Sequence, residues 1–84
     1  MGSLHNVTIR DIVYCGKNKN ANDIYMFVFV DNSSNTTYYF KATKSSEIFQ
    51  QLKDYHKKEL KIIAEYGNEG DFPCNCFRKV RLLQ

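Results

Sequence analysis

The stretch IYMFVFV (residues 24–30) holds seven apolar residues in a row and sets the architecture of the chain. It is too short to cross a membrane, which takes about 20 apolar residues, and it is rich in the β-branched and aromatic residues that favour strands. The polar cluster DNSSN (residues 31–35) follows it and is typical of a hairpin turn. We therefore expect a strand over residues 24–30 that turns back into a second strand over residues 36–43.

This run presents two apolar rows, because successive side chains of a strand point to opposite faces. Ile24, Met26, Val28 and Val30 form one row, and Tyr25, Phe27 and Phe29 form the other. We expect Met26 and Val28 to point into the core, which leaves the ring row on the outside. The alternative is a strand covered on both faces, by loops or by a second subunit.

The rest of the chain completes an alternation of strands around one helix. The first strand starts with Val7 and Ile9 alternating with polar residues and then changes phase, which indicates a bulge or a strand covered on both faces. Ser46 is placed to cap a helix whose apolar residues recur at helical spacing. The expected elements are strands over residues 6–15, 24–30 and 36–43, a helix over residues 46–57, and strands over residues 59–66 and 74–83.

Length and composition indicate a single folded domain over residues 1–84. A hydrophobic content of 43% and an aromatic content of 14% are typical of a chain that builds a core, and disordered chains are poorer in both. The N-terminus lacks the apolar core of a signal peptide, so we expect a cytoplasmic protein with no membrane association. Three cysteines, an odd number, indicate reduced thiols rather than a disulfide framework.

The order strand-strand-strand-helix-strand-strand resembles the OB-fold, the oligonucleotide/oligosaccharide-binding barrel, over nearly the whole chain. The resemblance is one of pattern, since this fold has no diagnostic motif. It implies a β-rich domain, a small five-stranded Greek-key barrel with one helix between the third and fourth strands. The competing architecture is an open antiparallel sheet with one helix packed across it.

The resemblance also implies a function, because OB-folds that bind nucleic acid use the face of the second and third strands. Exposed rings there stack on unpaired bases, and cations contact the phosphates. We therefore expect a small non-catalytic module that binds single-stranded nucleic acid, which a net charge of +3 permits but does not require. The candidate residues are Tyr25, Phe27, Phe29 and Tyr39 for stacking, and Lys41, Lys79, Arg81, Lys17 and Lys19 for phosphate contacts.

A second function fits the same face. Aromatic residues are enriched in protein interfaces, so the domain can instead be a protein-interaction module, either a homodimer or a small subunit of a larger assembly. The cations of residues 78–81 also suit an edge strand guarded against aggregation, and residues 17–23 also suit a solvated loop.

The sequence offers no motif for catalysis, a metal or a cofactor. Cys74 and Cys76 are separated by one residue, whereas paired cysteines of structural zinc sites are usually about two to four residues apart. The serines at positions 33, 34, 45 and 46 fall in turn or cap contexts, and the chain has no glycine-rich phosphate loop. We expect no enzyme activity, no metal site and no cofactor.

Overall fold

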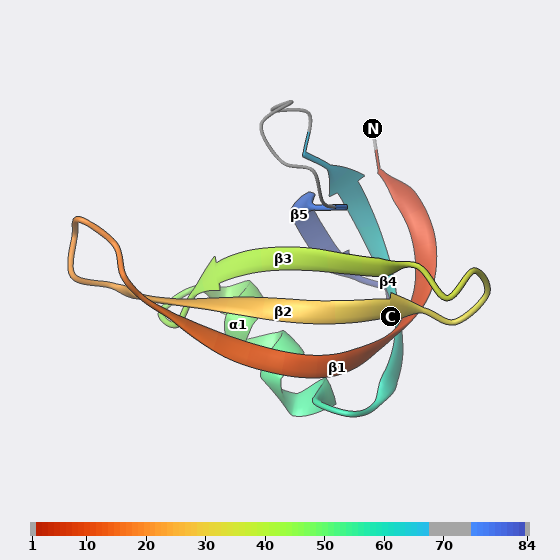
Figure 1. The fold of residues 1–84 in the computed structure, drawn as a ribbon, viewed down its shortest axis with the longest axis horizontal. Helices are drawn as coiled ribbons and strands as arrows, with labels where there is room; N and C mark the ends of the chain where they lie inside the picture. Colours follow the sequence, from red (N-terminus) through yellow and green to blue (C-terminus); the bar gives the residue numbers. More distant parts are fainter. Residues whose placement is uncertain (1, 68–74, 84) are drawn as a thin grey trace.

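Five antiparallel strands form one sheet in the order β3-β2-β1-β4-β5 within residues 2–67 and 75–83, the part of the chain that the computed structural model describes (Figure 1). The strands are β1 (Ser3–Lys17), β2 (Asp23–Asp31), β3 (Thr37–Thr43), β4 (Glu59–Tyr66) and β5 (Phe77–Leu82). A short helix, α1 (Glu47–Leu52), and a 3-10 turn, η1 (Lys53–Tyr55), connect β3 to β4. The expected β-rich fold with its helix after the third strand is confirmed at this level.

β1 is the central strand of the sheet order and joins its two halves, β3-β2 and β4-β5. Residues 3–8 pair with residues 59–64 of β4, and residues from 7 onward pair with β2. The register with β2 shifts between Ile9 and Asp11, which leaves Arg10 as the extra residue of a β-bulge. The bulge explains the change of phase in the sequence, since Ile9 before it is fully buried and Ile12 after it still packs against the core.

The rings of β2 point into the core, so the prediction that they lie outside is wrong. Phe27 and Phe29 are 0% exposed, whereas Met26 is half-buried. The reason lies in β3, where Phe40 pairs with Phe27 and Tyr38 pairs with Phe29. Paired residues of an antiparallel ladder share a face. Rings also bury more apolar area than aliphatic side chains, so the core forms on the ring side.

The helix is shorter than the expected span of residues 46–57. Ser46 caps it as expected, with its Oγ accepting a hydrogen bond from the Phe49 N–H at 3.2 Å. The chain then leaves the helical path to contact β1: the Lys57 N–H donates to the Ile9 carbonyl at 2.7 Å, and Lys57 takes a φ of 66°. The helical path, α1 followed by η1, thus ends at Tyr55, the last residue of the apolar pattern.

The two end strands of the sheet come together, with the Tyr38 ring of β3 stacked on the Phe77 ring of β5 at a centroid distance of 4.5 Å. Tyr39 of β3 forms a parallel bridge with Cys76, and the Tyr39 N–H donates to the Asn75 carbonyl at 2.9 Å. Among the described residues, no ladder joins β3 to β5 beyond this bridge, so the sheet is not closed. The last strand begins at Phe77 rather than at residue 74, and Cys74 lies outside the described residues.

Asp31 organises the turn between β2 and β3. Its Oδ1 accepts hydrogen bonds from the Ser33 N–H, the Ser33 hydroxyl and the Ser34 N–H at 2.9, 2.8 and 3.2 Å. Its Oδ2 lies 2.9 Å from Nδ1 of His5 on β1. The bonds from His5 and Ser33 hold the pKa of this buried carboxyl well below its usual range. The charged form of Asp31 therefore ties the hairpin to β1.

The inward orientation of the rings makes a stability prediction. Phe27→Ala should lower the free energy of unfolding by about 3–5 kcal/mol, because it empties a fully enclosed site. Met26→Ala, one residue away on the opposite face, should lower it by only about 1 kcal/mol. Urea denaturation of both variants measures the difference. A larger loss in Met26→Ala would show that the faces are reversed.

The Asp31 contacts make a prediction for acid. A carboxyl with a lowered folded-state pKa stabilises the fold above the unfolded pKa of about 3.9, and this contribution is lost as pH falls toward the folded pKa. Asp31→Asn removes the titrating group, so its free energy of unfolding should fall less steeply than that of the parent chain below about pH 4. Urea denaturation across this range measures both slopes, and equal slopes would contradict the assignment.

Candidate binding face

The outward side of β2 and β3 is an apolar face with a single charge. Side chains alternate along each strand, so the residues between the buried rings point outward. These residues, called the outer face below, are Ile24, Met26, Val28, Val30, Thr37, Tyr39, Lys41 and Thr43. Lys41 is the one charged side chain in this set, and it is exposed. Val28 is only 8% exposed, so the apolar contact that the face offers comes from the half-buried Ile24, Met26 and Val30, together with one cation.

Tyr39 supplies the one ring of the outer face. It is half-buried and pairs with Val28, while Lys41 pairs with Met26 next to it. The backbone of Tyr39 is held from the other side by the hydrogen bond to Asn75. Lys41 makes no ion pair with any residue in the described part of the chain. The ring and the cation are thus neighbours on β3, and the charge of Lys41 is not balanced by a carboxylate.

β1 extends the outer face beyond β2. Val13 pairs with Met26 and is exposed, and Asp11 pairs with Val28. Asp11 is an exposed carboxylate whose Oδ1 accepts a hydrogen bond from the Ile12 N–H at 2.9 Å. The outer face is therefore aliphatic in its middle, with the cation on the β3 side and an acid on the β1 side.

Three of the four rings expected to stack do not belong to the outer face. Phe27 and Phe29 are enclosed in the core, which leaves no ring surface for a base. Tyr25 points to the same inner side and is half-buried, with its ring 5.0 Å from that of Phe49 and 5.2 Å from that of Tyr14. These residues build the core behind the face rather than the face itself.

The loop between β1 and β2 carries Lys17 at its start and Lys19 near its tip. Lys17 Nζ lies 2.8 Å from Asp23 Oδ1, which also accepts a hydrogen bond from the Tyr14 hydroxyl at 3.0 Å. The Lys17–Asp23 contact raises the pKa of the lysine and lowers the pKa of the carboxyl. Lys19 is exposed and has no ion pair among the described residues. The loop thus adds one unbalanced cation.

Lys79 and Arg81 lie on a different part of the surface from Lys41. They pair with Glu65 and Ile63 of β4 and are exposed on the outward side of the β4–β5 half of the sheet. Neither residue pairs with β3, whose bridge to this region is made by Cys76, ahead of β5. The structure therefore does not bring these two predicted phosphate contacts onto the outer face.

The structure adds a hollow that the sequence did not indicate. It measures about 350 Å³, is open to solvent, and is lined by Ala21, Asn22, Asp23, Lys44, Ser45 and Gln50. The Lys44 N–H donates to the Asp23 carbonyl at 2.9 Å, which joins the loop before β2 to the segment after β3. Because its walls come from three separate segments, no local pattern could have predicted it. Its lining residue Lys44 is exposed, so Lys44 joins Lys19 as a second exposed lysine at the end of the outer face near the β1–β2 loop.

No group of three His, Cys, Asp or Glu side chains among the described residues is placed to hold a metal ion. No helix in residues 2–67 and 75–83 is long and apolar enough to cross a membrane. Comparison of the chain with known protein families, curated proteins and solved structures found no match. The function is therefore inferred from the outer face itself.

Proposed function

We propose that the chain is an OB-like barrel domain that binds single-stranded nucleic acid on its outer face. Three features support the barrel. β1 is bulged and pairs with two neighbours, the helix lies between β3 and β4, and the Tyr39–Cys76 bridge brings the two end strands together in parallel. This is the strand and helix order of the five-stranded, partly open barrels that hold oligonucleotides on the corresponding strands.

The observation that carries the binding proposal is the position of Tyr39 beside Lys41, the one charged side chain among the outward residues of β2 and β3. A base stacks on the exposed side of the tyrosine ring, and Lys41 contacts the neighbouring phosphate. The half-buried Met26 and the exposed Val13 extend the apolar surface under the next nucleotide. The arrangement needs no chemical step and no base-edge contacts, so it binds without sequence preference.

Electrostatics make the loop end of the face the positive end. Lys19 and Lys44 are exposed there, and the nearby carboxylate of Asp23 is balanced by Lys17. The phosphate backbone therefore runs from Lys41 toward the loop and away from Asp11. With one ring in place of the expected four, stacking contributes only about 1–3 kcal/mol. The cations then account for a larger share of the affinity, which makes it strongly salt-dependent.

The stacking role of Tyr39 is tested by a fluorescence-anisotropy titration of a labelled single strand of about 20 nucleotides. This length exceeds the roughly 4–16 nucleotides that one OB-fold covers. Tyr39→Ala should weaken binding by about 5- to 150-fold, the equivalent of ~1–3 kcal/mol. Tyr39→Phe keeps the ring and should bind like the parent chain. Unchanged affinity in Tyr39→Ala, with the fold intact by circular dichroism, would remove the stacking role.

The phosphate contact of Lys41 is tested by the salt dependence of the same titration. For single strands the slope of log affinity against log salt changes by about 0.7 for each phosphate contact. Lys41→Gln should reduce the slope by about this amount. Lys53→Gln removes an exposed lysine of η1 and should leave the slope unchanged. Equal slopes in the two variants would place the phosphates elsewhere.

A protein partner is the second candidate, favoured by the exposed Val13 and the half-buried Met26, which lie next to each other on the face. Interface cores are depleted of charge in the same way. An apolar interface responds weakly to salt, so the titrations above separate the two functions. If no single-stranded nucleic acid binds at low salt, and the mass of the protein from size-exclusion chromatography rises with its concentration, the outer face is a homodimer interface instead.

A further inference from the structure

Ser3, His5 and Asp31 form a continuous hydrogen-bonded line at the end of the sheet away from the β1–β2 loop. Ser3 Oγ lies 2.9 Å from His5 Nε2, and His5 Nδ1 lies 2.9 Å from Asp31 Oδ2. A carboxylate only accepts hydrogen bonds, so the imidazole proton is on Nδ1. In the neutral ring Nε2 is then an acceptor, and the Ser3 hydroxyl donates to it. This is the connectivity of nucleophile, base and orienting acid in acyl-transfer enzymes.

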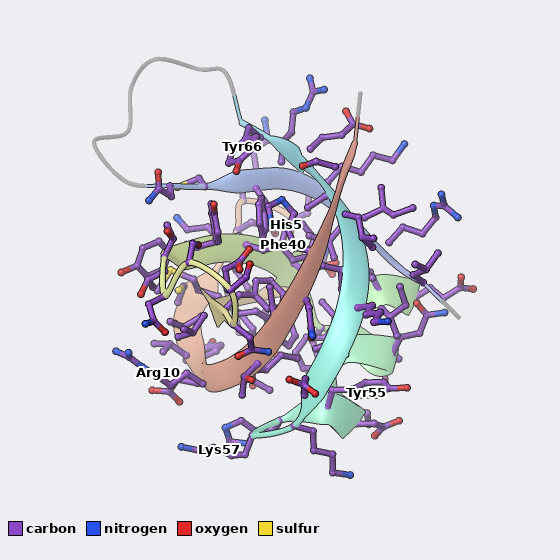
Figure 2. All side chains as sticks on the ribbon, turned by 90° about the vertical axis from the view of Figure 1, so that its right-hand side faces the viewer. His5, Arg10, Phe40, Tyr55, Lys57 and Tyr66 are labelled. Carbon is purple, nitrogen blue, oxygen red and sulfur yellow. The ribbon has the colours of Figure 1, made fainter. Side chains whose placement is uncertain are left out.

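The two inner members of the line are shielded and fixed. The side chains of His5 and Asp31 are 10% and 9% exposed. The rings of Tyr38, Tyr66 and Phe77 surround the imidazole, with centroids 5.4, 6.1 and 5.3 Å away. Figure 2 shows His5 within the curve of the sheet, whereas Arg10 and Lys57 project outward. The other oxygen of Asp31 is occupied by the turn, so Oδ2 is directed at His5.

Ser3, at the solvent end of the hydrogen-bonded line, is accessible. Ser3 is exposed, and its strand has a free edge at this point, since β1 pairs with β2 only from Val7 onward. The Asn6 carbonyl faces the β2 side, where it accepts from the Asn32 N–H. Backbone groups alternate in direction along a strand, so the Leu4 N–H points to the same side, where no described strand covers it. A donor on the residue after the nucleophile is where hydrolases place one of their oxyanion donors.

We propose that Ser3 is a nucleophile activated by His5, with Asp31 as the positioning residue, and that it cleaves small activated esters. Ser3 Oγ attacks the carbonyl carbon while His5 Nε2 takes the hydroxyl proton. The bond to the leaving oxygen breaks, and His5 returns the proton to that oxygen. Water then attacks the acyl carbon with His5 as base, which releases the acid and restores the Ser3 hydroxyl.

The surroundings of Ser3 fit an aryl ester. Tyr66 is 49% exposed and its ring stands edge-on to His5, so it offers an apolar surface beside the base. An aromatic leaving group that packs there lies close to the nitrogen that protonates it. This reactive line is separate from the outer face and does not depend on nucleic-acid binding.

The proposal is tested with a fluorophosphonate probe, which forms a bond from Ser3 Oγ to phosphorus and releases fluoride with the proton taken by His5. Mass spectrometry of the digested protein should place the label on Ser3. His5→Gln should lower the labelling rate by about 100-fold or more, and Ser3→Ala should abolish it. Hydrolysis of 4-nitrophenyl acetate should fall in parallel.

Matched controls are the exposed His56 and Ser45, which lie outside the line. His56→Gln and Ser45→Ala should label and hydrolyse like the parent chain. Because His5→Gln can loosen the fold, its circular dichroism and unfolding midpoint are compared first, and Ser3→Ala, an exposed change, serves as the second variant. Label found on other residues, or ester hydrolysis equal in Ser3→Ala and the parent chain, would overturn the proposal and leave the line a structural one.

Discussion

The fold depends on one strand serving two partners. β1 pairs with β4 through residues 3–8 and with β2 from residue 7 onward, and the extra residue Arg10 lets it turn from one to the other. A bulge strengthens the local twist and bends the strand, so Ile9 and Ile12 both reach the core although they do not share a simple alternation. Without that bend the two halves of the sheet could not enclose the same rings.

Which face of a strand points to the core was predictable where polar and apolar residues alternate along it. Where a strand is apolar throughout, its orientation was not predictable. In β3 the polar Lys41 between Phe40 and Ala42 fixes the phase, and the sequence placed Tyr39 and Lys41 on one side correctly. The run of residues 24–30 has no polar residue, so it contains no phase of its own. Its orientation is imposed by β3 across the ladder, and the assumption that Met26 points inward placed three rings on the wrong side.

The candidate site likewise contains features that the sequence predicts and features that it does not. Tyr39 and Lys41 follow from local alternation, whereas the hollow beside Lys44 and the line through His5 exist only after folding. His5 and Asp31 are 26 residues apart in the chain, and a serine two residues before a histidine is no motif until the strand sets both on one side. Burial among Tyr38, Tyr66 and Phe77 gives the histidine its setting, and no spacing in the sequence records it.

Tyr39 also connects β3 to the segment that precedes β5. Its backbone N–H donates to the Asn75 carbonyl, and the Asn75 side-chain amide donates to the Thr37 carbonyl at 3.4 Å, while the Tyr39 ring lies on the outer face. A link of this kind opens at lower cost than a full ladder. Any ligand that grips the ring more strongly in the shut form than in the open form shifts the population toward the shut form. A ligand bound as proposed on the outer face would therefore hold the two end strands more tightly together.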